Sequence, residues 1–238
     1  MAKAALARAE RGERPGSTTL SALPPITRRT QVVDALREAI VSGRFQPGAK
    51  ITELDLAKRF AISRGPIREA IRELINEGLL VNRPYSATHV AAVDERTIAE
   101  AYDLRRVLEV HAWRLAWPRS DAHLKAVLEE RHEALQRALG AGNIFEEIRA
   151  EMTFHSTSFE FSGSELLVST WRQIAQRIQL GFSVYQVGVG GPASGEHWRY
   201  LEFALGDDFD ALRREVERHI DQGMAGVRDF FSIRPQHS

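Results

Sequence analysis

The feature that most restricts the fold of this chain is the run TELDLAKRFAISRGPIREAIRELINEGLL at residues 52–80. It has the pattern of two short helices joined by a tight turn. Thr52 followed by Asp55 forms a capping-box-like helix start, and Ser63 is placed to cap a second helix. Gly78 suits the left-handed conformation in which many helices end. The run therefore predicts a helix-turn-helix.

Each of these two helices carries an apolar stripe, and the second also carries a basic one. The apolar positions are Leu54, Leu56, Ala57 and Phe60 in the first helix and Ile67, Ala70, Ile71 and Leu74 in the second. Arginines recur every fourth residue on another side of the second helix, at Arg64, Arg68 and Arg72, and Gly65 leaves room beside them. Such a row can grip phosphates or read guanine edges in a major groove. The alternative is a solvated surface helix whose arginines pair with Glu69 and Glu73.

The residues around this run favour the DNA-binding interpretation. A helix is expected before it, at Arg29–Ser42, and two short strands after it, at Leu79–Asn82 and Thr88–Ala92, which frame a hairpin-like wing. The segment SRGPIREAIRELINEGL resembles the hallmark of the winged helix-turn-helix in GntR-family transcription regulators, close to SRxPVREALRxLxxEGL. The resemblance covers residues 31–93.

The resemblance implies which residues contact DNA. It places Arg64, Gly65 and Arg68 at positions that contact the operator in that family. The wing departs from the family pattern, because Ser86-Ala87 stands where an Arg-Gly pair is common at the wing tip. The resemblance therefore does not supply a wing arginine for the minor groove.

Charge is divided unevenly along the chain, although the net charge is zero. Residues 1–92 hold 15 Lys+Arg against 9 Asp+Glu, a net +6, and residues 93–238 hold 17 against 23, a net −6. This division is expected of a basic DNA reader joined to a part that does not touch DNA. The absence of cysteine excludes disulfides and thiolate metal sites. No stretch has the length of a membrane span or the apolar core of a signal peptide, so we expect a cytoplasmic protein.

We expect a mainly α fold with four segments along the chain. Residues 1–25 are interpreted as a flexible arm, 26–93 as the winged helix-turn-helix, 94–233 as an all-helical domain for effector binding and dimerisation, and 234–238 as a tail. Asp94 is expected to cap the first helix of the all-helical domain, which ends at Pro118. Five more helices follow in a six-helix bundle, at about 121–139, 144–161, 165–185, 196–205 and 209–231, with breaks at Gly140, Gly142, Gly163, Gly188–Gly195 and Gly206.

Four residues of this bundle have the pattern of a metal site. Glu151 and His155 are four apart and share one helix face, while His197 and His219 lie about equally far from the turn between the last two helices. One carboxylate and three imidazoles suit Zn, Ni or Mn. The alternative is that each histidine is an ordinary core or surface residue. The pattern also resembles the FCD effector domain of the FadR branch of the GntR family, where the acid is usually Asp rather than Glu151.

Arg105 is the predicted effector-binding residue. It matches an arginine that often faces the effector near the metal in that domain, with Arg106 as the neighbouring substitute. A guanidinium beside a metal suits a small carboxylate. The alternative for Arg105 is a helix ion pair with Glu109.

These observations predict a ligand-responsive transcription regulator. The expected form is a homodimer on a pseudo-palindromic operator, with a small carboxylate effector bound near a divalent metal. Repression relieved by the effector is implied by the resemblance. Two alternatives stay open: a metal-dependent enzyme acting on a small acid, and a regulator whose metal is purely structural.

Overall fold

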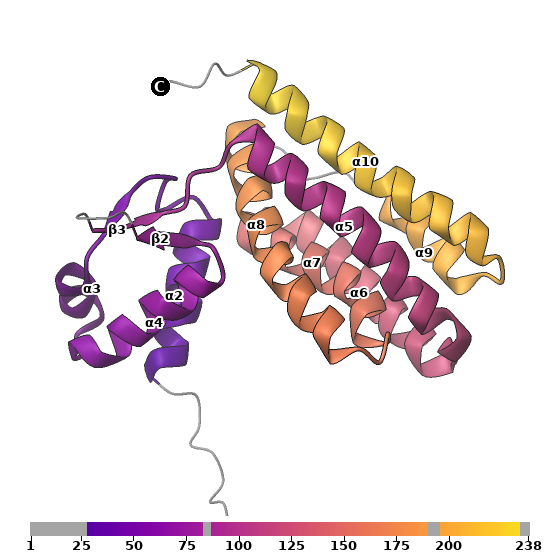
Figure 1. Ribbon diagram of the computed structural model, residues 1–238, viewed down its shortest axis with the longest axis horizontal. Coiled ribbons are helices and arrows are strands. Elements are labelled where there is room, and N and C mark those ends of the chain that lie inside the picture. The colour runs from indigo at the N-terminus through magenta and orange to yellow at the C-terminus, as the bar shows by residue number, and fades with distance from the viewer. Residues whose placement is uncertain (1–27, 83–86, 190–195, 234–238) are drawn as a thin grey trace, which may run out of the picture.

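The computed structural model describes residues 28–82, 87–189 and 196–233, and these form a small head and a long helical body (Figure 1). The predicted flexible arm (1–25), the wing-tip residue Ser86 and the tail (234–238) lie outside the described residues. We use "head" for residues 28–93 and "body" for residues 94–233. The mainly α fold predicted from the sequence is confirmed.

The head combines three helices with a three-stranded antiparallel sheet of order β1-β3-β2. In chain order its elements are α2 (Arg28–Val41), β1 (Lys50–Ile51), α3 (Glu53–Phe60), α4 (Arg64–Asn76), β2 (Leu80–Asn82) and β3 (Thr88–Val90). In the sheet, His89 lies opposite both Lys50 and Val81. Helices α3 and α4 form the predicted helix-turn-helix, and β2 with β3 forms the base of the predicted wing.

The helix ends in the head follow the sequence signals with one difference. The Thr52 side chain accepts a hydrogen bond of 3.2 Å from the backbone N–H of Asp55, as expected of a cap. Ser63 has the extended backbone of a cap but makes no side-chain capping bond. The turn between the helices passes through Ala61 in the left-handed conformation at φ 53°, and Gly78 has φ 79°.

Leu54 is not part of the apolar face that the sequence pattern assigned to it. Its side chain is 52% exposed, whereas Leu56 is buried in the head core with Ile67 and Leu74. Residues two apart on an α-helix point about 200° apart, so Leu54 and Leu56 cannot both face the core. Leu56 is the one of the two that packs in the core of the head.

The body contains six α-helices among its described residues, as predicted. They are α5 (Glu95–Ala116), α6 (Ala122–Ala141), α7 (Ile144–Glu160), α8 (Glu165–Val189), α9 (His197–Leu205) and α10 (Phe209–Ile233), with a single 3-10 turn, η1 (Trp117–Arg119), after α5. Two expected breaks are wrong: Gly140 lies inside α6, which ends at Ala141 with Gly142 as its C-cap, and Gly188 lies inside α8. A glycine within a helix costs only about 1 kcal/mol relative to alanine, which neighbouring packing offsets.

Helix α5 occupies the middle of the body, between α10 on one side and α7 and α8 on the other (Figure 1). Its N-terminus is capped by the Asp94 side chain, which accepts a 2.7 Å hydrogen bond from the backbone N–H of Thr97. The central position of α5 buries Tyr102, Arg105 and Glu109, which face the interior of the bundle. Charged residues on this helix can therefore contribute to an interior site.

Head and body share core residues. Leu180 of α8 is 4% exposed and belongs to the hydrophobic core of the head, while Val41 of α2 belongs to that of the body. The two parts are thus packed on each other, and these two side chains belong to that contact. No helix in the described part of the chain is both long and apolar enough to cross a membrane.

Candidate functional site

The structure brings Glu151, His155, His197 and His219 together as a four-residue cluster in the interior of the body. One donor atom from each residue lies within 4.8 Å of the others, and all four residues are buried. Helix α7 supplies two of them because residues four apart share a helix face. The hairpin of α9 and α10 brings the other two histidines to the same level.

The distances inside the cluster suit a single divalent cation. Glu151 Oε2 lies 2.9 Å from His197 Nε2, and Glu151 Oε1 lies 3.4 Å from His155 Nε2. The imidazole of His219 has its centroid 4.6 Å from that of His197 and 5.0 Å from that of His155. Donors about 2.0–2.2 Å from one ion lie roughly 3–4.4 Å apart, so the cluster needs only small side-chain adjustments. The buried Nδ1 of His219 has no hydrogen-bond partner among the described residues.

Glu109 supports this cluster from α5, a role that the sequence patterns did not indicate. Its Oε1 lies 2.7 Å from His155 Nδ1 and accepts a 2.7 Å hydrogen bond from the Tyr200 hydroxyl. Its Oε2 accepts a 2.9 Å hydrogen bond from Arg105 Nε. A carboxylate on one imidazole nitrogen fixes the tautomer and leaves the other nitrogen for a metal. The sequence indicated Glu109 only as the partner of Arg105 in an ion pair along one helix.

Burial and mutual contacts shift the pKa values of the cluster and of the carboxylate that supports it. Burial alone raises the pKa of Glu151, but the imidazoles of His197 and His155 hold that pKa well below its usual range. Burial and the neighbouring histidines lower the pKa of His219 well below its ordinary value, so its ring is neutral. For Glu109, burial again raises the pKa, and His155 and Arg105 outweigh it to leave a lowered pKa. Burial and Arg105 lower the pKa of His155, but the carboxylates of Glu109 and Glu151 outweigh them and raise it. The carboxylates are therefore ionised and His219 is neutral, and a metal bound at His155 would displace a proton from that ring.

Arg105 is buried beside the cluster, and its predicted ion pair with Glu109 is present. The guanidinium carbon lies 5.8 Å from the Tyr102 ring centroid and 5.9 Å from that of Trp171. Arg105 Nη2 has no hydrogen-bond partner among the described residues, and neither has the buried hydroxyl of Tyr102. The ion pair and a free donor thus coexist on one guanidinium. Arg106 instead pairs with Asp221 at the surface.

The arginine row of α4 lies on the surface of the head. Arg64, Arg68 and Arg72 are all exposed, and nothing lies within 4 Å of a Cβ built on Gly65. The acidic partner of Arg68 comes from α3: Glu53 accepts hydrogen bonds of 3.0 Å from Nε and 3.2 Å from Nη2.

The alternative for this row was that its arginines pair with Glu69 and Glu73 of the same helix. Glu73 does not follow that alternative. Glu73 lies 3.1 Å from Arg29 of α2 instead. The row is thus exposed, and Arg68 within it contacts the start of α3.

Comparison with known proteins assigns both parts of the chain. Residues 28–90 match the family "Bacterial regulatory proteins, gntR family", and residues 100–222 match the "FCD domain". The "Uncharacterized HTH-type transcriptional regulator YdhC" of Bacillus subtilis is 34% identical over 80% of this chain and 87% of its own length. The "Probable D-xylose utilization operon transcriptional repressor" of Paenarthrobacter nicotinovorans is 31% identical over 66% of this chain and 69% of its own.

A solved structure has the same arrangement of elements. The fold of Escherichia coli McbR/YncC superposes with a TM-score of 0.74, covering 86% of this chain and 99% of that one at 24% identity. This likeness concerns the fold. The matched head, the matched body and the 34% identical relative show that this chain belongs to the GntR family of bacterial regulatory proteins, with a DNA-binding helix-turn-helix domain followed by an FCD domain.

Proposed function

We propose that this regulator is a homodimeric repressor whose body binds a divalent metal and a small carboxylate effector. The observation that carries the proposal is the buried four-residue cluster beside Arg105. Nη2 of Arg105 is a hydrogen-bond donor without a partner among the described residues. The winged helix-turn-helix domain, residues 26–93, binds the operator, and the all-helical domain, residues 94–233, binds the effector and the second subunit. The relative named as a D-xylose utilization operon repressor supports the sign of regulation.

The metal ligands in this proposal are Glu151, His155, His197 and His219. Three imidazole nitrogens and one carboxylate suit Zn, Ni or Mn, and the longer side chain of Glu151 still reaches two of the histidines. A bound divalent ion supplies positive charge beside Arg105. Arg105 in turn offers Nη2 to an effector carboxylate, in an interior where burial strengthens a charge-assisted hydrogen bond.

The effector acts through its different affinities for the DNA-competent and DNA-incompetent arrangements of the head. Helix α8 is suited to connect the two sites, because it carries Trp171 next to Arg105 and Leu180 in the head core. A shift of α8 on effector binding would move the packing contact with the head. We infer that the effector weakens operator binding.

The enzyme alternative needs a general base separate from the metal ligands. The nearest further carboxylate, Glu109, already accepts hydrogen bonds from three side chains, so it is poorly suited to remove a proton. Metal analysis of the full chain, followed by melting with a panel of small carboxylates, separates the functions. Saturable stabilisation without turnover supports a sensor, turnover supports an enzyme, and no stabilisation at all supports a purely structural metal.

Replacing Arg68 with alanine is expected to weaken operator binding by about 10–100-fold, because one good base or phosphate contact is worth about 1–3 kcal/mol. The measurement is fluorescence anisotropy at fixed salt on duplexes selected by the protein from a random library. Arg137→Ala removes an exposed arginine of the body and serves as the control, with unchanged affinity expected. Unaltered affinity and sequence preference in Arg68→Ala would remove Arg68 from the proposed interface.

Glu53 is placed to orient Arg68 for guanine. It occupies the Nε and Nη2 edge of the guanidinium, which leaves Nη1 and the outer N–H of Nη2 for a second partner. Those two groups together match the O6 and N7 acceptors of guanine. An exposed ion pair adds little stability, so its value here is orientation.

Glu53→Gln is expected to reduce discrimination for guanine at the base pair read by Arg68, while binding to non-specific duplex becomes tighter. Asp55→Asn is the matched control, since it removes one charge from the same turn of α3 but Asp55 pairs with Arg59. Both variants should tighten non-specific binding, and only Glu53→Gln should lose guanine preference when single-base operator variants are titrated. Equal base preference in the two variants would reject the orienting role of Glu53.

A further inference from the structure

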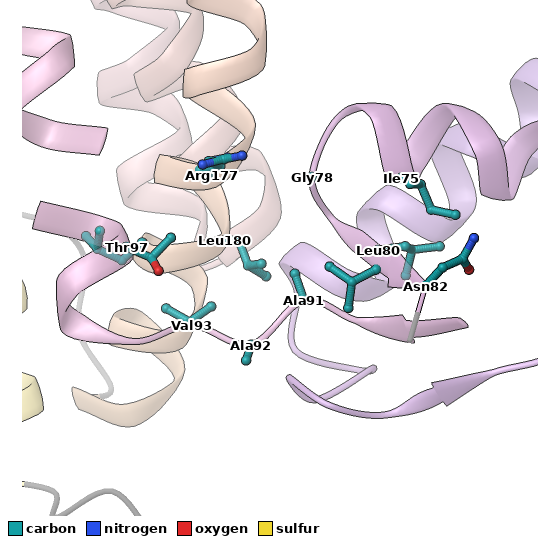
Figure 2. Close-up of a pocket in the computed structure, with 12 residues that line it drawn as sticks. Ile75, Gly78, Leu80, Asn82, Ala91, Ala92, Val93, Thr97, Arg177 and Leu180 are labelled. Carbon is teal, nitrogen blue, oxygen red and sulfur yellow. The ribbon is translucent and has the colours of Figure 1, made fainter. Parts of the chain in front are cut away.

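A cleft of about 600 Å³ lies where the head meets the body. Figure 2 shows α8 with Arg177 and Leu180 on one side, the head with Gly78 and Leu80 on the other, and the connecting segment 91–93 running between them. Its size and position at a domain boundary are those of small-molecule sites in proteins, which occupy about 300–1,000 Å³. It lies outside the four-residue cluster and uses none of the proposed effector residues.

The wall of this interdomain cleft is largely apolar. Leu80, Val93, Ile98 and Leu180 give it aliphatic surface, and Asn82 and Thr97 contribute neutral polar groups, all among the described residues that line it. Arg177 is the charged residue of that set. An apolar wall with one cation and a few polar groups matches a ligand that has an apolar part and a single negative charge.

Arg177 is available to bind an anion. It is exposed and makes no ion pair or side-chain hydrogen bond with another described residue. Its side chain lies against Gly78, where a Cβ would come within 3.5 Å of Nε. Gly78 follows the C-terminus of α4, the end of a helix that carries partial negative charge and attracts a cation. The guanidinium therefore lies between the end of the recognition helix and the open cleft.

We propose that the interdomain cleft is a second ligand site, for a small amphipathic monocarboxylate. Its carboxylate pairs with Arg177, and its apolar part packs against Leu80, Val93 and Leu180. A dicarboxylate fits less well, because the described lining offers one cation and its second charge would find no ionic partner there. The site is independent of the metal cluster.

Ligand binding there reports on the arrangement of head and body, because the two parts supply opposite walls. Any change in their relative position changes the affinity, and by reciprocity the ligand changes the stability of that position. A carboxylate on Arg177 also draws the guanidinium away from the end of α4. The cleft thus gives the regulator an input that acts directly on the recognition helix.

The test measures binding to the full chain by isothermal titration calorimetry. The probe is octanoate, and octanamide is its neutral counterpart. Metal-free protein and the Arg105→Gln variant exclude carboxylate binding at the metal cluster. Arg177→Gln removes the proposed partner, and Arg172→Gln, an exposed arginine of the same helix outside the cleft, is the matched control.

We expect saturable octanoate binding that persists without metal and in Arg105→Gln, is unchanged in Arg172→Gln and falls at least about tenfold in Arg177→Gln, with octanamide similarly weak. Binding that disappears with the metal, or in Arg105→Gln protein that still unfolds cooperatively, would assign the carboxylate to the metal cluster and overturn the cleft site. Equal binding by wild type and Arg177→Gln, or no saturable binding to wild type, would also overturn it. Failure of the metal proposal leaves these results unaffected.

Discussion

His219→Ala is expected to abolish stoichiometric metal binding by the purified protein. His219 brings a neutral imidazole into the cluster, and its Nδ1 has no hydrogen-bond partner among the described residues. Changing even an outer supporting residue of a metal site costs about 10–100-fold in affinity, so loss of a ligand costs on the order of 100-fold or more. The measurements are metal content by mass spectrometry and competition against a chelator of known affinity. The melting temperature of the variant should no longer rise with added metal.

His123→Ala provides the control for this experiment. His123 is an exposed histidine of α6 that packs against Phe161 and lies outside the cluster. Its replacement should leave metal content and the metal-dependent melting shift unchanged. A metal content in His219→Ala equal to that of wild type would mean that this histidine is an ordinary buried residue.

Glu109→Gln is expected to cause the second-largest effect, because one carboxylate supports both Arg105 and His155. Without its charge, the buried guanidinium loses its ion-pair partner, and breaking such a pair costs about 3–5 kcal/mol. The hydrogen bond that fixes the His155 tautomer also weakens, so metal affinity should fall by about 10–100-fold. Urea unfolding of the metal-free protein gives the first quantity, and chelator competition gives the second.

Glu147→Gln is the matched control for Glu109→Gln. Glu147 is another glutamate of low exposure in the body, and burial raises its pKa, so neutralising it should cost little. The metal affinity and the free energy of unfolding of the Glu147→Gln protein should both stay close to those of wild type. If Glu109→Gln unfolds like wild type and keeps its metal affinity, then Glu109 does not link the arginine to the metal ligand.

The helix-turn-helix was predictable because its signals are local. The cap at Thr52, the apolar stripe of α4 and the left-handed Gly78 each depend on residues within one or two turns. The apolar spacing in α3 wrongly placed Leu54 on the buried face, because spacing alone does not show which side of a short helix packs against its neighbour. Packing against α4 decided that question.

The cluster was partly predictable for a similar reason. Helical spacing put Glu151 and His155 on one face, and a hairpin with symmetric arms brought His197 near His219. Glu109 escaped prediction because it reaches His155 across the bundle, from a helix whose angle and register no local signal gives. The roles of these residues in binding metal and effector stay predictions.

The sequence by itself determined the helices, the turn between α3 and α4 and the division of charge between the two parts, since these depend on neighbouring residues and on composition. The tertiary structure decided which residues are in contact across the fold. Glu53 binds Arg68, Glu109 binds both Arg105 and His155, and Leu180 of the body packs in the core of the head. Such contacts join residues far apart in the chain, and their geometry follows from how whole helices pack rather than from any short pattern.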